Sequence, residues 1–254
     1  MASLYLVPNT LDHGSGEQPA LSTVLPQAVI EQAARLTHWV AEDAKSARAF
    51  LKRVQALHPL ALPLQSLQIQ ELPRPPKDGR SSGTRSELQA AMARLLEPLH
   101  RGVDMGLISE AGLPAVADPG SELVAQAHRL GAAVVPLSGP NSMVLALAAS
   151  GLQGQSFAFV GYLPQEAGAR AARLRELQAR SQREIQTQLL IETPYRNEAV
   201  MAALLQHLAP GTRVSVACGL SLPQGWCRTL TVEQWRRQPP VFEKGLPAVF
   251  GFLA

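Results

Sequence analysis

Short apolar runs alternate with amphipathic segments along the first half of the chain. Four of these runs predict buried strands, at residues 4–7, 39–41, 105–109 and 133–137. Apolar positions at helical spacing and helix-start signals predict helices at residues 26–34, 44–57, 84–99 and 121–130. Because strands and helices alternate with short turns between them, we expect a mostly parallel sheet covered on both faces.

The pattern changes after Pro140, where predicted strands follow one another more closely. Strands are expected at residues 157–160, 189–192, 214–218, 228–231 and 248–253. Helices are expected at residues 143–149, 168–180 and 195–208. We therefore predict two α/β domains, residues 1–137 with a mostly parallel sheet and residues 138–254 with a mixed sheet.

Residues 59–83 are rich in proline and glycine, which favours irregular structure. We expect an extended strand at residues 62–69 and a mobile loop at residues 72–83. Thr84 and Glu87 have the spacing of a capping box, which would begin the next helix.

The composition is that of an ordinary globular protein of 254 residues with a formal net charge of +3. Its pI of about 9.1 permits a nucleic-acid partner, although a mildly basic solvated surface is the simpler explanation. Two cysteines and scattered histidines give neither a disulfide framework nor the spacing of a metal site. With no signal-peptide pattern and no apolar run of about 18 residues, we expect a cytoplasmic protein without a metal or a membrane span.

Two glycine-rich segments, residues 106–120 and 137–152, each follow or join a predicted strand. Glycine lets the backbone approach a ligand closely. Neither segment fits GxGxxG or GxxxxGK[ST], and the chain has no GxSxG. The residues alone predict an α/β protein that binds a nucleotide-like ligand at its strand ends, with Glu110 placed to reach a ribose hydroxyl.

Several motifs follow one another in a fixed order: LYLVP, AED, SEAGLPAVADPG, VVPLSGPNSMVLALAASGL, FAFVGYLP, ETPYR and KGLPAVFGF. The set, which spans the chain, resembles the tetrapyrrole methylase superfamily of S-adenosylmethionine (SAM) dependent methyltransferases. Within it the chain is most similar to the bacterial branch that methylates a ribose 2′-hydroxyl of 16S ribosomal RNA.

The resemblance implies two α/β domains with SAM in a cleft between them, usually in a homodimer. By position in the family motifs, it implies these cofactor-binding residues: Pro8, Glu110, Leu113, Asn141, Ser142, Thr193 and Ala248. The chain also departs from the family pattern. Glu110 stands where the family has Asp, and Asn141 and Ser142 stand where it has Ser-Ala. Motifs on the substrate side diverge further, so methylation of a tetrapyrrole or another small molecule, and SAM binding without catalysis, stay as alternatives.

Transfer of a methyl group to a ribose hydroxyl needs a base, because the hydroxyl proton must leave. Glu42 and Asp43, at a predicted strand end, are the candidate catalytic carboxylates. The alternative for Asp43 is a helix N-cap. Asn141 and Ser142 have the same alternative, and Glu110 has that of a turn residue.

Arginines on the helix predicted at residues 168–180 suggest an RNA contact. Arg170, Arg173 and Arg175 are the candidates there, with a solvated helix face as the alternative. Arg196 is a further substrate candidate, whose alternative is a salt bridge to Glu192 or Glu198. The apolar residues 241–253 are expected to contribute to a homodimer.

Overall fold

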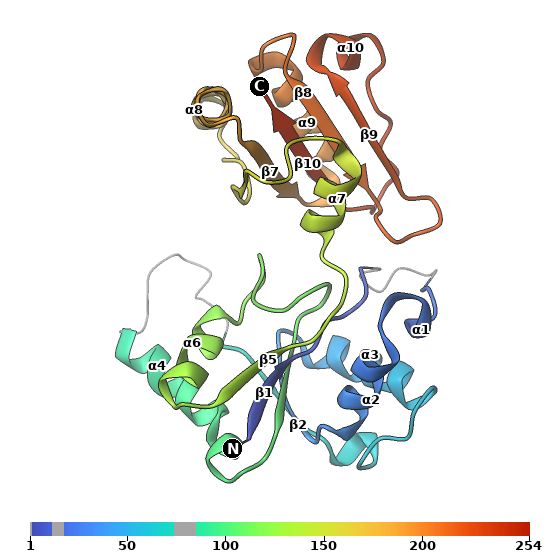
Figure 1. Ribbon diagram of the computed structural model, residues 1–254, viewed down its shortest axis with the longest axis vertical. Helices are drawn as coiled ribbons and strands as arrows, with labels where there is room; N and C mark the ends of the chain where they lie inside the picture. The colour runs from blue at the N-terminus through green and yellow to red at the C-terminus, as the bar shows by residue number, and fades with distance from the viewer. Residues whose placement is uncertain (1, 12–17, 74–84) are drawn as a thin grey trace. The chain divides into compact units, whose positions relative to one another are not determined.

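The computed structural model describes residues 2–11, 18–73 and 85–254, without the side chains of residues 85 and 86. The chain divides into two compact units, Met1–Pro140 and Asn141–Ala254, called here the N-terminal and the C-terminal unit (Figure 1). The sequence places this boundary after residue 137. The loop predicted at residues 72–83 and the cap residue Thr84 lie almost entirely outside the described residues.

The N-terminal unit is built on a five-stranded sheet of order β3-β2-β4-β1-β5. Its strands are β1 Ser3–Leu6, β2 His38–Ala41, β3 Gln68–Glu71, β4 Met105–Ile108 and β5 Ala133–Pro136. Every neighbouring pair in the sheet is parallel. The predicted parallel sheet is confirmed, and the carboxyl ends of its strands lie at one edge.

Successive residues of β2 show how helices cover both faces of this sheet. The side chains of Trp39 and Ala41 pack with the helices α1 Leu21–Val24, α2 Gln27–Arg35 and α3 Ala44–Gln55. Val40, between them, packs on the opposite face with α4 Arg85–Leu95, α5 Glu97–His100 and α6 Ser121–Arg129. Figure 1 shows α2 and α3 on one side of the sheet and α4 and α6 on the other. Burial on both faces explains why the inner strands β2 and β4 are nearly continuous in apolar residues, whereas the edge strand β3 is largely polar and exposed.

Two predicted boundaries in this unit are wrong. The strand expected at residues 62–69 begins only at Gln68 and follows a short 3₁₀ helix, η1 Leu64–Ser66. It begins there because β2 supplies its pairing partner from His38 onward. The helix expected at residues 84–99 is broken into α4 and α5 at Leu96, two residues before Pro98. Proline has no N–H for the hydrogen bond that a continuous helix requires.

The C-terminal unit has a second five-stranded sheet, of order β6-β7-β10-β8-β9. Its strands are β6 Phe157–Phe159, β7 Thr187–Glu192, β8 Arg213–Cys218, β9 Trp226–Thr231 and β10 Ala248–Leu253. The pair β6–β7 is parallel and the other three pairs are antiparallel. The predicted mixed sheet is confirmed.

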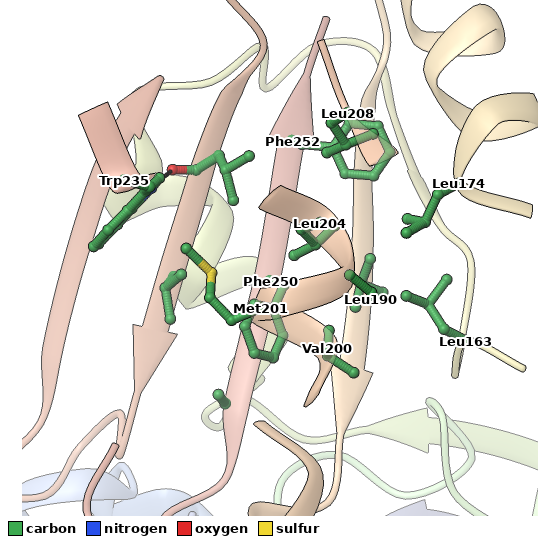
Figure 2. Packing of buried hydrophobic residues seen from close by; sticks show 14 of the residues in the cluster. Leu163, Leu174, Leu190, Val200, Met201, Leu204, Leu208, Trp235, Phe250 and Phe252 are labelled. Atoms are coloured by element: carbon green, nitrogen blue, oxygen red, sulfur yellow. Dashed lines mark hydrogen bonds between the residues drawn. The ribbon is translucent and has the colours of Figure 1, made fainter. Parts of the chain in front are cut away.

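The larger core of this unit lies on one face of the sheet, beneath α8 Ala167–Glu184, α9 Asn197–His207 and α10 Val232–Arg237. A short 3₁₀ helix, η2 Pro194–Arg196, precedes α9. Figure 2 shows Met201 and Leu204 of α9 beside Phe250 of the central strand β10. The Trp235 indole donates a hydrogen bond to the Val214 carbonyl at 2.8 Å, which satisfies its N–H inside this core.

The opposite face is covered by α7 Ser142–Ser150. Met143 and Leu147 pack on Leu189, and Ala146 packs on Ala217 and Val249. Four apolar side chains on α7 and β6 remain 38–56% exposed: Val144, Leu145, Phe157 and Phe159.

This distribution corrects part of the reason given for a dimer, since Val241 is exposed but the strand that follows it is not. Within residues 241–253, every residue of β10 is buried in the sheet, so this strand cannot supply an intersubunit surface.

No helix among the described residues has both the length and the apolar character needed to cross a membrane.

Candidate active site

The loop that follows β4, residues 109–120, is held by Asn9, which follows β1. The Asn9 side-chain amide donates to the Glu110 carbonyl at 2.9 Å and to the Ser109 carbonyl at 3.3 Å. The Asn9 backbone N–H donates to the Gly112 carbonyl at 2.9 Å, in an isolated antiparallel bridge. Asn9 is buried, so these bonds form away from water and fix the loop against the end of β1.

Left-handed backbone conformations shape the same loop. Gly112 has φ 66° and Gly120 has φ 128°, values that glycine adopts without strain. Ala115 and Ala117 have φ 65° each, although each carries a Cβ. A non-glycine residue in this region costs on the order of 1–3 kcal/mol, and such strain is concentrated at ligand-binding and catalytic sites.

The second glycine turn approaches the first strand closely. A Cβ built on Gly139 would lie 2.3 Å from the Cβ of Pro8. Real Cβ atoms do not come this close, so glycine is required at position 139 for packing. Pro8 is buried in this contact.

Three carboxyl groups lie together at the carboxyl ends of β2 and β4: those of Glu42, Glu110 and Asp118. The Glu42 carboxylate accepts a hydrogen bond from the Glu110 backbone N–H at 3.1 Å. Burial, with smaller contributions from Glu42 and Glu110, raises the pKa of Asp118 from 3.8 to about 7. The cluster therefore contains a carboxyl that holds or releases a proton near neutral pH.

Ser109 lies next to this cluster. Its hydroxyl lowers the pKa of Asp118 in part. Ser109 is only 3% exposed, and its Oγ makes no hydrogen bond of ordinary distance and angle within the described part of the chain.

Asp43 is the N-cap of α3, which was its structural alternative. Its Oδ1 accepts from the Ser46 N–H at 2.7 Å and from the Ser46 hydroxyl at 2.9 Å. Asn141 likewise caps α7, since its Oδ1 accepts from the Val144 N–H at 3.0 Å. Ser142 is the first residue of that helix.

The C-terminal unit brings Thr193 and Ala248 to one edge of its sheet. Ala248 begins β10 and lies opposite Glu192, the last residue of β7. The Glu192 Oε1 accepts from the Thr193 N–H at 2.8 Å and from its hydroxyl at 3.1 Å. Arg196 lies 3.3 Å from the other Glu192 oxygen, so the salt bridge given as its alternative is present.

The arginines of α8 are partly engaged with their own surroundings. Arg170 donates to the carbonyls of Pro164 and Gln165, and Arg173 forms a surface ion pair with Glu176 at 2.8 Å. Arg175 is exposed. A hollow of about 510 Å³ lies between α8 and α9, and Arg170 and His207 are among its lining residues.

Comparison with known protein families identifies the family of this chain. A model of the Tetrapyrrole (Corrin/Porphyrin) Methylases matches residues 17–234. The chain belongs to this family.

Curated relatives of this tetrapyrrole methylase bear the name ribosomal RNA small subunit methyltransferase I. The protein from Halalkalibacterium halodurans is 42% identical over 103 residues, which are 41% of this chain and 34% of the relative. That from Pasteurella multocida is 32% identical over 156 residues, 59% of this chain and 53% of the relative. The chain thus spans about a third to a half of the length of the curated relatives it matches.

Two solved structures share the fold. The methyltransferase CobJ has a TM-score of 0.57 at 14% sequence identity. The matched region covers 98% of this chain and 92% of the CobJ chain. The native form of uroporphyrin III C-methyltransferase from Thermus thermophilus has a TM-score of 0.55 at 17% sequence identity. The matched region covers 99% of this chain and 97% of that one. At these identities the comparison confirms two α/β domains of the tetrapyrrole methylase type.

The structure brings together, in the N-terminal unit of this tetrapyrrole methylase, the predicted residues Pro8, Glu42, Asp43, Glu110 and Leu113, all at one edge of the sheet. Sequence reasoning missed Asn9, Ser109 and Asp118. The segment ADPG had carried a usable signal, since Asp118 precedes the proline and glycine that end the loop after a buried strand. Among the residues that the structure covers, no cluster of three or more His, Cys, Asp or Glu forms a metal site.

Proposed function

We propose that the chain is a SAM-dependent methyltransferase that methylates a ribose 2′-hydroxyl of 16S ribosomal RNA. The observation that carries this proposal is the similarity to relatives named ribosomal RNA small subunit methyltransferase I, together with membership of the methylase family. The parallel sheet supports it, because ligands of α/β folds bind at the carboxyl ends of the strands.

SAM is the proposed cofactor, and it supplies an activated methyl group on a positively charged sulfur. The strand-end loops fit such a ligand: Gly112 and Gly139 bring backbone close to neighbouring segments, and the buried Ser109 Oγ has unused hydrogen-bonding capacity. In the N-terminal unit, Pro8, Glu110 and Leu113 are proposed to contact SAM. Glu110 is exposed at the end of its strand, so its carboxylate is accessible to a ribose hydroxyl.

In the C-terminal unit, the proposed cofactor contacts are Asn141, Ser142, Thr193 and Ala248. Asn141 keeps its amide N–H groups for a ligand because its Oδ1 alone is used in the helix cap. Ala248 has no polar side-chain atom, so it contributes packing and backbone at the sheet edge.

The proposed RNA contacts are Arg170, Arg173, Arg175 and Arg196. The exposed Arg175 is the most accessible of them. Arg173 can exchange a surface ion pair for a phosphate at little cost, since exposed pairs contribute only about 0–1 kcal/mol. Arg196 is held by the buried Glu192, so its guanidinium is oriented before RNA binds.

Glu42 and Asp43 were the candidate bases. The Asp43 carboxylate is engaged in capping α3, and the Glu42 carboxylate holds the Glu110 N–H. Both are proposed to shape the site, Asp43 by fixing the start of α3 and Glu42 by fixing the loop after β4.

A homodimer is also proposed, now on a different surface. The exposed side chains of Val144, Leu145, Phe157 and Phe159 lie on α7 and the edge strand β6. A second copy would bury these apolar groups. Light scattering at tens of micromolar should report a dimer, and Phe159→Glu should shift it to monomer.

Mass spectrometry of 16S ribosomal RNA from a deletion strain tests the acceptor. We expect one ribose methylation to be lost and to return when the gene is restored. Calorimetry with the purified protein tests the cofactor, with SAM and S-adenosylhomocysteine both binding in the presence of a chelator. If SAM binds and RNA methylation is unchanged by the deletion, a small-molecule acceptor or a purely SAM-binding protein replaces this proposal.

Glu110→Gln tests the cofactor site directly. The substitution keeps the size of the side chain and removes its charge. Loss of one charge-assisted hydrogen bond, worth about 1.5–3 kcal/mol, should weaken SAM binding roughly ten- to hundredfold. Unchanged affinity, or a large loss of thermal stability without ligand, would make Glu110 a structural turn residue.

A further inference from the structure

Arg53, in the last turn of α3, joins segments that are far apart in the sequence. Its Nη1 group donates to the Thr10 hydroxyl at 3.1 Å, and its Nη2 group donates to the Pro19 carbonyl at 2.7 Å. Thr10 follows β1 and Pro19 precedes α1. One guanidinium therefore holds the chain soon after the first strand and again just before the first helix.

Thr10 carries this contact to the loop after β4. It is only 1% exposed, and its N–H donates to the Asn9 Oδ1 at 2.9 Å. Its carbonyl accepts a longer hydrogen bond from the Gly112 N–H at 3.4 Å. The Asn9 side-chain amide donates to the Glu110 carbonyl of the same loop at 2.9 Å. A continuous set of hydrogen bonds thus runs from Arg53 to both loops at this edge of the sheet.

The helix α3 is a firm anchor for the guanidinium. Asp43 caps its N-terminus, and the buried side chains of Phe50, Leu51 and Val54 fix it to the core around Arg53. The guanidinium is itself a planar fork, so little freedom is lost for each hydrogen bond that it forms. The position of the fork is therefore set by packing that lies outside the two loops.

We propose that Arg53 is a positioning residue for the cofactor, because it holds the loops after β1 and β4 in the arrangement that binds SAM. This inference rests on the proposed function, in which Pro8 and Leu113 are among the cofactor contacts. Pro8 lies two residues before Thr10, and Gly112 directly precedes Leu113. Arg53 acts on the ligand through the loops that it holds.

The geometry of the contact calls for arginine. A guanidinium presents several N–H groups in a fixed fork and can hold two acceptors at once, whereas the lysine ammonium is a compact point charge. Hydrogen bonds from a charged donor are also about twice as strong as those between neutral groups. Loss of the fork should therefore loosen both loop segments, and a lysine should restore only part of the contact.

Calorimetry with S-adenosylhomocysteine tests the role of Arg53. Arg53→Met keeps an extended side chain and removes every donor. We expect the dissociation constant to rise by about 5- to 30-fold, in the range found for residues that act on a site through a network of contacts. Arg53→Lys should lose less. The matched control is Arg48→Met, an exposed residue of α3 that donates to the Ala44 carbonyl of its own helix, and its affinity should stay within about twofold.

The second arm uses the partner of Arg53. Thr10→Val keeps the shape of the side chain, removes the hydroxyl, and should weaken binding by at least about threefold. The double variant should bind no more weakly than Arg53→Met, because both changes remove the same hydrogen bond. Hydrogen exchange in the free protein should accelerate at the Gly112 N–H in each variant.

Two further measurements separate positioning from a general loss of stability. A purely structural role for Arg53 would lower the melting temperature and leave the dissociation constant, measured well below that temperature, unchanged. In a methylation assay, KM for SAM should rise in Arg53→Met while kcat falls little, because the loops contact the cofactor before and during methyl transfer alike.

The possible results distinguish this role from the proposed function. An increase of less than about fivefold in Arg53→Met, or additive losses in the double variant, would overturn the role of Arg53 and leave the function standing. If Arg53→Met does not fold, an unchanged affinity in Thr10→Val would overturn it as well. If the wild type binds SAM and methylates no RNA, the proposed acceptor fails, while calorimetry still decides the role of Arg53. If the wild type binds no SAM, both fall.

Discussion

Helices cover both faces of both sheets, but the N-terminal sheet is parallel whereas the C-terminal sheet is mixed. In the parallel sheet all strands end at the same edge, so residues far apart in sequence, such as Glu42 and Glu110, come together there. The mixed sheet gathers the end of β7 and the start of β10, which pairs Glu192 with Ala248. Strand direction thus decides which polar residues share an edge.

The two units also differ in charge. The N-terminal unit has 12 Lys and Arg against 13 Asp and Glu, and the C-terminal unit has 11 against 7. The excess positive charge of the chain therefore belongs to the C-terminal unit, which carries the arginines of α8. The carboxyl groups at the strand ends of the N-terminal unit are partly or fully exposed, and the exposed arginines of the C-terminal unit suit attraction of a phosphate backbone.

The largest expected loss of folding stability comes from removing a buried side chain, and it tests whether the two hydrophobic cores are independent. Leu51→Ala, in α3, and Leu204→Ala, in α9, each remove a side chain with no exposed surface. Each should lower the free energy of unfolding by about 2–5 kcal/mol in urea denaturation. Hydrogen exchange should accelerate mainly in the strands of the mutated unit. Leu57→Ala, whose side chain is 51% exposed, is the control and should stay within about 0.5 kcal/mol. Equal acceleration in both units would show that the cores are not separate.

A smaller effect is expected where the second glycine turn meets Pro8. Gly139→Ala forces a Cβ against the proline ring, and overpacking of this kind costs about 1–3 kcal/mol. The loop must shift, so SAM binding should weaken as well, measured by calorimetry. Gly154→Ala, with no atom within 4 Å of its added Cβ, is the matched change in the C-terminal unit and should leave both quantities nearly unaltered. Wild-type affinity in Gly139→Ala would remove this turn from the cofactor site.

Substitution of Asp43 separates helix capping from catalysis. Asp43→Ala should lower thermal stability by about 0.5–2 kcal/mol because the Ser46 N–H loses its acceptor. Asp43→Asn should restore stability, since Asn caps helices as well as Asp does. We expect the methylation rate of Asp43→Asn to stay near wild type. A rate lowered by about 10²- to 10⁴-fold would return Asp43 to the role of base.

The smallest effect on stability is expected for the arginines of α8. Replacing Arg170, Arg173 and Arg175 together by Ala should change the unfolding midpoint little, because the groups that Arg170 and Arg173 bind lie largely at the surface. RNA binding should become less dependent on salt, with the log–log slope falling by about 0.7–0.9 for each phosphate that no longer meets an arginine. SAM affinity should not change. An unaltered slope would make this helix an ordinary solvated surface.

Local patterns in the sequence predicted most elements of both units. Apolar runs located the strands, and cap residues located helix starts such as that after Asn141. Such signals act within a few residues, so they can be recognised without the fold. The helix α10 was overlooked although Thr231 and Gln234 form a capping box of the same local kind. The family motifs, read in order, also identified the methylase fold.

Only the tertiary structure decided which of these residues act together. It buried β10, which looked from its composition like an intersubunit surface, in the middle of a sheet. It split one predicted helix at Leu96 before Pro98, and it placed the Asn9 side chain on the loop after β4. Asp118 acquires its raised pKa from burial and from Glu42, which follows a strand far away in sequence. Burial and charge proximity are set by strand order and register, and no local pattern encodes them.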